Sequence, residues 1–139
     1  MAFPIPQKLA SATIEQLRLC GLSRRKAEYI RDISKLIADG KLDLEKLKNY
    51  EDSQEIIDEL CKIRGIGVWT AKLTMIRGMH KLDALQADDL GLRRTISHYY
   101  CNDSRISSEE ARKIAKNWGK WAGLAGFYLI VTERLGIII

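Results

Sequence analysis

The chain has 139 residues, a formal net charge of +5 at pH 7 and a pI near 9.2. Its 46% hydrophobic and 29% charged residues exclude a disordered or fibrous chain and indicate one globular domain with a real core. No apolar run approaches the roughly 20 residues that span a bilayer, so membrane-spanning classes are excluded. The positive charge is compatible with a polyanionic partner but does not establish one.

The cysteines indicate a reducing compartment. Cys20, Cys61 and Cys101 are odd in number and far apart, which favours free thiols over disulfides or a metal cluster. The N-terminus lacks the basic and apolar regions of a signal peptide. We therefore expect a protein of the prokaryotic cytoplasm or, in a eukaryote, of the nucleus.

Helix start and stop signals follow one another along the whole chain. Thr13 and Gln16 form a capping box for a short helix that Gly21 closes, and Ser23 caps a longer helix that ends at Gly40. A weak helical turn is expected at 44–47. Three further helices are expected from Asp52 or Ser53 to about Cys61, from about 68 up to Gly78, and from Asp88 or Asp89 through Tyr99. The last two are expected from a Ser107–Glu110 capping box through Trp118 and from about Trp121 to Arg134.

Strands are not predicted. No stretch alternates apolar and polar residues over enough positions to form a convincing strand, and the only prolines, Pro4 and Pro6, interrupt no helix. The sequence therefore predicts a compact all-α protein.

The stretch Leu60 to Ala71, LCKIRGIGVWTA, is the most informative part of the chain. Gly65 and Gly67 flank one apolar residue, and we expect both to adopt backbone shapes that other residues avoid. The turn leads to a helix N-terminus, whose free N–H groups can hold an anion. An ordinary corner between two helices is the alternative, because an isolated Gly-x-Gly is common.

Two adjacent acids, Asp88 and Asp89, follow in the run DDLGLRR. Either can serve as a helix N-cap, and we expect that role for Asp88. A carboxylate can also stabilise positive charge that develops on a sugar and can orient or deprotonate water. We expect that chemical role for Asp89.

Together these motifs resemble the helix-hairpin-helix (HhH-GPD) DNA glycosylase superfamily. The chain is most similar to the branch that removes alkylated purines, the 3-methyladenine DNA glycosylase II type. The resemblance covers almost the whole chain and is carried by the hairpin residues Leu60, Ile63, Gly65, Ile66, Gly67, Thr70 and Ala71, the run DDLGLRR, FPxPQxLA at 3–10, GLSx5YI at 21–30, and 118–129.

The resemblance implies one glycosylase domain over 1–139 that is incomplete at its N-terminal side. Barrel helices would occupy about 1–80, with the hairpin at 60–77, and C-terminal helices with the catalytic aspartate would occupy about 81–139. Family members begin with further helices before Phe3, which carry the wedge that fills the gap left by the extruded base. We therefore expect a homo-oligomer, or a second chain that supplies the missing helices.

The resemblance also implies how the protein would hold duplex DNA with a damaged base. Backbone carbonyls of Cys61, Ile63 and Ile66 would bind a Na⁺ or K⁺ ion that bridges to a DNA phosphate, a contact that reads no base. The expected DNA-binding residues are Arg64, Gly65, Ile66, Gly67, Val68, Thr70 and Arg93.

For the chemistry, the resemblance places Asp89 on the family's catalytic aspartate. Trp69 stands where lyase-competent relatives carry a nucleophilic lysine, which implies a monofunctional hydrolase of base excision repair. Trp69 would line the base pocket and attract cationic alkylated purines through its ring face, with Phe127 and Tyr128 as further walls. Packing of Trp69 in the core is the alternative.

The chain also departs from the family. Ala122 and Ile130 stand where an arginine and a tryptophan are frequent in this branch. The cysteine-rich tail that holds an iron–sulfur cluster in other branches is missing. No iron–sulfur cluster is therefore expected. The activity of this chain alone is open. The alternatives to an enzyme are a non-catalytic helix-hairpin-helix DNA-binding module, half of a split glycosylase that is inactive alone, or a decayed relative.

Overall fold

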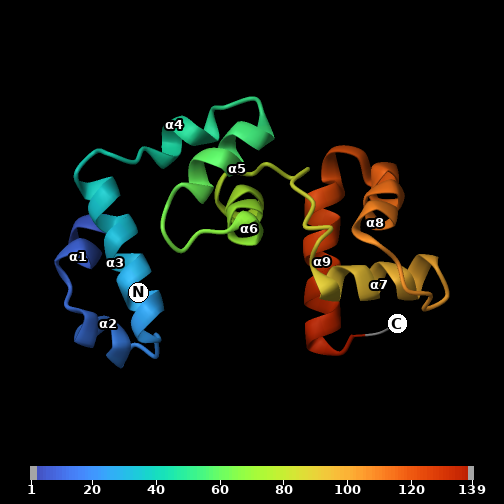
Figure 1. Ribbon diagram of the computed structural model, residues 1–139, viewed down its shortest axis with the longest axis horizontal. Coiled ribbons are helices and arrows are strands. Elements are labelled where there is room, and N and C mark those ends of the chain that lie inside the picture. Colours follow the sequence, from blue (N-terminus) through green and yellow to red (C-terminus); the bar gives the residue numbers. More distant parts are fainter. Residues whose placement is uncertain (1–2, 138–139) are drawn as a thin grey trace. The chain divides into compact units, whose positions relative to one another are not determined.

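The computed structural model describes residues 3–137, and these residues are helical with no strand (Figure 1). The chain divides into two compact units, Met1–Ile66 and Gly67–Ile139. The division falls inside the Gly-Ile-Gly turn. The all-α prediction is confirmed, and no described helix is long and apolar enough to cross a membrane.

The first unit contains five helices, which run from blue to green in Figure 1: α1 (Pro6–Ser11), α2 (Ile14–Leu19), α3 (Arg24–Ala38), α4 (Leu44–Lys48) and α5 (Ser53–Cys61). Helices α1 and α2 both pack against α3. Ile14, Leu17 and Ala27 form the buried cluster of this packing, and Ile56 and Leu60 of α5 are almost fully buried.

The helix starts in this unit follow local side-chain chemistry. Thr13 and Gln16 form both hydrogen bonds of a capping box at α2, and the Ser23 hydroxyl accepts the Lys26 N–H at the start of α3. Asp52, rather than Ser53, caps α5. Each cap satisfies N–H groups that a helix leaves free, which is why the sequence could place these helices.

The second unit contains α6 (Val68–Gly78), α7 (Leu90–Tyr100), α8 (Ser108–Ala115), the short 3₁₀ helix η1 (Lys116–Trp121) and α9 (Ala122–Leu135). Helix α7 packs against α8 and α9. Leu92, Ile96 and Ile130 belong to the buried cluster between these elements. The predicted Ser107–Glu110 capping box is present at α8.

Trp118 and Trp121 are three residues apart but differ in burial. Trp118 packs against the core cluster, but Trp121 is 50% exposed. Gly119, at φ +53°, bends the chain between them, so the two indoles do not share the face that a continuous helix would give them.

Candidate active site and nucleic-acid interface

Asp89 and Trp69 meet at the start of helices α7 and α6. Asp89 is half-buried and is the N-cap of α7: its Oδ1 accepts the Leu92 N–H at 3.0 Å. Its Oδ2 accepts the indole Nε1–H of Trp69 at 2.8 Å. Both carboxylate oxygens are therefore oriented by hydrogen bonds.

The prediction that Asp88 caps α7 is wrong, since Asp89 makes that cap. Asp88 instead lies within 3.0 Å of the Arg112 guanidinium through both of its oxygens. A hydrogen bond from Ser108, together with Arg112, lowers the pKa of Asp88 below its ordinary value. The two adjacent acids thus have separate roles, one joined to α8 and one facing Trp69.

The segment from Met79 to Asp89 connects α6 to α7 without regular secondary structure, yet much of it is buried. Lys72 Nζ donates to the Leu85 carbonyl at 3.0 Å, and the buried Gln86 side chain makes a long 3.5 Å contact to the Trp69 carbonyl. Burial lowers the pKa of Lys72, and the negative charge of Asp88 partly opposes that shift. Sequence reasoning missed both Lys72 and Gln86; the three-residue spacing from Trp69 to Lys72 is the one signal that could have indicated a shared helix face.

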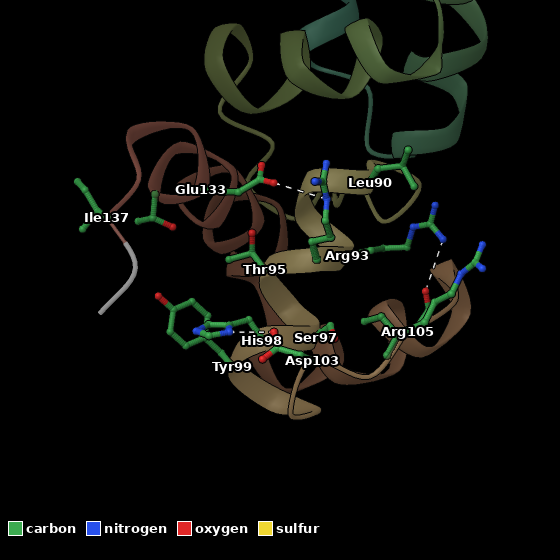
Figure 2. A pocket seen from close by; sticks show the side chains of 13 residues that line it. Leu90, Arg93, Thr95, Ser97, His98, Tyr99, Asp103, Arg105, Glu133 and Ile137 are labelled. Atoms are coloured by element: carbon green, nitrogen blue, oxygen red, sulfur yellow. Dashed lines mark hydrogen bonds and ion pairs between the residues drawn. The ribbon is translucent and has the colours of Figure 1, made fainter.

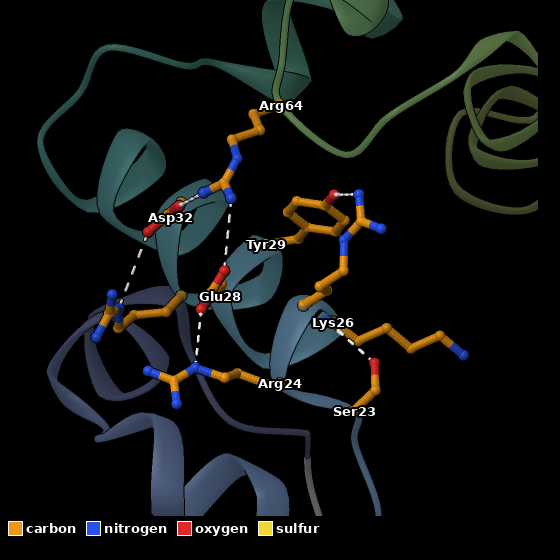
Figure 3. Close-up of polar contacts among 9 residues, drawn as sticks. Ser23, Arg24, Lys26, Glu28, Tyr29, Asp32 and Arg64 are labelled. Atoms are coloured by element: carbon orange, nitrogen blue, oxygen red, sulfur yellow. Dashed lines mark hydrogen bonds and ion pairs between the residues drawn. The ribbon is translucent and has the colours of Figure 1, made fainter.

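The turn that precedes α6 requires a glycine at one of its two glycine positions. Gly65 has φ +94°, and an added Cβ would overlap the ring of Tyr29 on α3. The guanidinium of Arg64 also lies 5.3 Å from the centre of the Tyr29 ring (Figure 3). Tyr29 was not identified as a site residue from the sequence, although it belongs to the GLSx5YI motif.

The expectation that Gly67 also adopts a shape other residues avoid is wrong. Gly67 has φ −102° and ψ 174°, an extended conformation open to any residue, and an added Cβ would meet no atom within 4 Å. Gly67 is the N-cap of α6 and provides no side-chain hydrogen bond to it. Val68, the first residue of α6, is 51% exposed. The N-terminus of α6 therefore presents N–H groups beside open space.

The arginines predicted to bind DNA have intramolecular partners. Arg64 lies 3.4 Å from Glu28 and 3.3 Å from Asp32, two carboxylates of α3 (Figure 3). Arg93 contacts the Ile106 carbonyl at 3.5 Å, and its Nε is buried without a hydrogen-bond partner. A phosphate would have to compete with these contacts, so the DNA-binding role of both arginines stays a prediction.

The other predicted pocket residues lie on α9. Phe127 is half-buried, and the Arg77 guanidinium lies 5.8 Å from its ring centre. Tyr128 is 60% exposed and its ring lies 5.9 Å from that of Phe127. The structure thus joins Trp69 to Asp89 and joins Phe127 to Tyr128, and the assignment of all four to one base pocket stays a prediction.

A separate pocket of about 590 Å³ opens on α7 and the end of α9 (Figure 2). His98 and Asp103 form a contact of 2.9 Å at its wall. Several apolar side chains that line it are exposed: Leu90 at 65%, Tyr99 at 41% and Ile137 at 48%. This pocket coincides with none of the predicted base-pocket residues.

The Trp69–Asp89 pair defines what the site can do chemically. A fixed carboxylate at a helix N-terminus stabilises a developing positive charge nearby without reorganising during a reaction. The adjacent indole carries no nucleophilic amine. Among the described residues there is no group of three or more His, Cys, Asp or Glu side chains that could hold a metal ion.

The fold is that of a helix-hairpin-helix protein of DNA repair. The sequence model of the HhH-GPD superfamily of base excision DNA repair proteins matches residues 1–120. The chain belongs to the HhH-GPD superfamily, which confirms the resemblance inferred from its motifs.

Two relatives are similar to this chain over most of its length. The DNA-3-methyladenine glycosylase of Bacillus subtilis is 34% identical over 129 residues, 91% of this chain and 42% of that protein. The DNA-3-methyladenine glycosylase of Saccharomyces cerevisiae is 32% identical over 109 residues, 76% of this chain and 37% of that protein. The chain thus spans less than half the length of these two relatives.

Solved structures agree with the sequence comparison. A 3-methyladenine DNA glycosylase from Archaeoglobus fulgidus matches with a TM-score of 0.80 and 38% identity, covering 99% of this chain and 45% of that one. The Schizosaccharomyces pombe 3-methyladenine DNA glycosylase Mag1, solved in complex with abasic DNA, matches with a TM-score of 0.81 and 25% identity, covering 99% and 66%.

Proposed function

We propose that the chain is a monofunctional DNA glycosylase of base excision repair that hydrolyses the N-glycosidic bond of extruded alkylated purines. The observation that carries this proposal is the 2.8 Å hydrogen bond from the Trp69 indole to the Asp89 carboxylate. It brings the expected aromatic wall of a base pocket to the expected acid. The names of the relatives support the same substrate class. We expect the protein wherever the genome is, in the prokaryotic cytoplasm or the eukaryotic nucleus.

The reaction needs charge stabilisation at the sugar. As the bond between the base and C1′ breaks, the base leaves with the bonding electrons and positive charge grows on the sugar. The Asp89 carboxylate stabilises that charge, and water adds to C1′ and releases a proton to the carboxylate or to solvent. Alkylated purines are cationic and therefore good leaving groups, so the step needs no strong general acid.

Trp69 can contact the extruded base and the Asp89 carboxylate at the same time. Its edge N–H is occupied by Asp89, while the side chain remains 41% exposed, which does not fit a purely structural core position. A cationic purine stacked on an indole face gains about 0.5–2 kcal/mol. Tyr128 and Phe127 would add further walls to this pocket.

The open N-terminus of α6 is the expected phosphate contact. The N-terminus of α6 has no side-chain cap, and an anion is favoured at such a helix N-terminus. A Na⁺ or K⁺ ion on the carbonyls of Cys61, Ile63 and Ile66 would assist this contact. The Ile63 carbonyl already accepts the Ile66 N–H at 3.0 Å, which leaves one lone pair for such an ion.

The decisive experiment is release of methylated bases from duplex DNA. We expect release by the wild-type chain and its loss, by at least about 100-fold, in Asp89→Asn. Asparagine retains the α7 cap, so the fold should persist. The matched control is Asp88→Asn, an adjacent acid that contacts Arg112 instead, and its rate should stay within about threefold of wild type. Salt-sensitive duplex binding without release by the wild type would instead identify a non-catalytic binding module and overturn the proposal.

The exposed apolar pocket on α7 and α9 supports a protein partner as well. We propose that another copy of this chain covers Leu90, Tyr99 and Ile137. Large exposed apolar side chains gathered around one pocket are typical of an interaction site.

A further inference from the structure

The segment that carries Asp89 has no regular secondary structure. Residues 79–89 form neither helix nor strand, yet Met79, Ala84, Gln86 and Ala87 are all at most 7% exposed. The segment makes some backbone hydrogen bonds of its own, such as that from the Asp89 N–H to the Gln86 carbonyl at 2.9 Å. Its other buried polar groups need partners from outside the segment, and side chains that supply such partners help to position Asp89.

Several hydrogen bonds join this segment to helix α6, among them one from the Lys81 N–H to the Met75 carbonyl at 3.0 Å. Lys72 Nζ donates to the Leu85 carbonyl at 3.0 Å, four residues before Asp89. Gln86 reaches back to the Trp69 carbonyl. Trp69 and Lys72 are three residues apart on α6 and so lie on one face of that helix. That face therefore contacts the segment near Leu85 and again at the Asp89 carboxylate.

Helix α9 supports the other side of the segment. The Leu124 N–H donates to the Leu82 carbonyl at 3.0 Å. An added Cβ at Gly123 would come within 2.7 Å of the Ala84 backbone nitrogen. The Ala84 backbone therefore packs closely against α9, and Lys72 ties the Leu85 carbonyl to α6.

We propose that Lys72 is a positioning residue that latches segment 79–89 to α6 and thereby holds Asp89 against the Trp69 indole. This inference rests on the proposed function for its kinetic consequence, but the latch itself is a property of the fold. Lys72 is not proposed to contact the substrate. Its effect passes through the Leu85 carbonyl to the carboxylate.

The test compares Lys72→Met with wild type. Methionine keeps much of the apolar stem but donates no hydrogen bond. We expect single-turnover release of methylated bases to fall about 10- to 100-fold, as small displacements of a reacting group do, while the Kd for duplex DNA stays within about twofold. Lys72→Arg retains a hydrogen-bond donor. We expect the logarithm of its rate to lie at least halfway from the value for Lys72→Met to the value for the wild type. Lys113→Met, at an exposed lysine of α8 paired with Glu109, is the matched control and should behave as wild type.

A second readout does not need activity. In a ¹H–¹⁵N spectrum, the Trp69 indole resonance reports its hydrogen bond to Asp89, and its assignment follows from its absence in Trp69→Phe. We expect Lys72→Met to shift this resonance and to speed its exchange with solvent at least fivefold, with no such change in Lys113→Met. An unchanged resonance and rate in Lys72→Met would overturn the latch while leaving the proposed function intact. Failure of Asp89→Asn to lose activity would overturn the proposed function, and the resonance would still decide the latch.

Discussion

At the scale of single residues, Asp89 and Trp69 each have two uses. One oxygen of Asp89 caps α7 and the other accepts the indole N–H. Trp69 offers its edge to the acid and leaves its side chain 41% exposed. The pair therefore gives the acid a fixed orientation before any DNA arrives, which reduces the cost of organising the site during the reaction.

The indole N–H can be tested separately from the ring. Trp69→Phe keeps an aromatic face but removes the donor to Asp89. Because a hydrogen bond to a charged group contributes about 1.5–3 kcal/mol, we expect base release to slow by about tenfold or more in single-turnover assays, while the Kd for duplex DNA changes by less than twofold. Trp121→Phe, at an indole that is 50% exposed, is the control. Equal rates for wild type and Trp69→Phe would contradict a role for the donor.

Sequence reasoning found both members of this pair but assigned the cap to the wrong acid. Asp88 and Asp89 are the same residue type in adjacent positions, and a cap pattern tolerates a shift of one residue. What separates them is tertiary: Arg112 and Ser108 on α8 contact Asp88, and Trp69 contacts Asp89. Lys72 and Gln86 escaped prediction for the same reason, because their partners are backbone carbonyls that no side-chain pattern records.

At the scale of elements, the Gly-Ile-Gly turn contains two glycines with different requirements. Gly65 is fixed by its positive φ and by the Tyr29 ring. Gly67 is conformationally ordinary and has open space at its Cα. The first glycine therefore serves the fold, whereas the second leaves the α6 N-terminus accessible.

Alanine substitutions separate the two requirements. Gly65→Ala should destabilise the protein by about 2–4 kcal/mol, through the left-handed backbone and the collision with Tyr29, as measured by urea unfolding. Gly67→Ala should leave the unfolding midpoint unchanged but weaken duplex binding severalfold, because its methyl group occupies space that a phosphate would need. Equal destabilisation by the two changes, or unchanged duplex affinity in a folded Gly67→Ala, would count against this division.

Helix prediction succeeded where the signal was local. Both capping boxes are present as expected, because each depends on residues three apart. The helix predicted through Trp118 was less accurate: α8 ends at Ala115 and a 3₁₀ helix follows, which Gly119 bends at φ +53°. Nothing in the local pattern required Gly119 to adopt that conformation, so the exposure of Trp121 could not be foreseen.

At the scale of the whole molecule, several large apolar side chains are exposed among the described residues. The second unit exposes Leu90, Tyr99 and Ile137 around one pocket. This exposure fits a partner polypeptide on this surface.

Sedimentation tests the partner. We expect the isolated 15.8 kDa chain to self-associate at micromolar concentration rather than to sediment as one species. Leu90→Ser should shift that equilibrium toward the monomer, since Leu90 lines the pocket, whereas the equally exposed Leu135, which is not among the pocket's lining residues, should tolerate serine without effect. A monodisperse monomer with one cooperative melting transition would contradict the proposed partner.

The double use of Asp89 also bears on how such proteins can lose their activity over evolutionary time. A lineage released from the need to excise bases would still be selected for a stable α7, and Asp89 satisfies that need by itself. An aspartate at this position is therefore weak evidence for enzymatic activity in distant members of the superfamily. The helix cap does not require the neighbouring indole N–H donor. A retained tryptophan at that position is therefore stronger evidence for enzymatic activity.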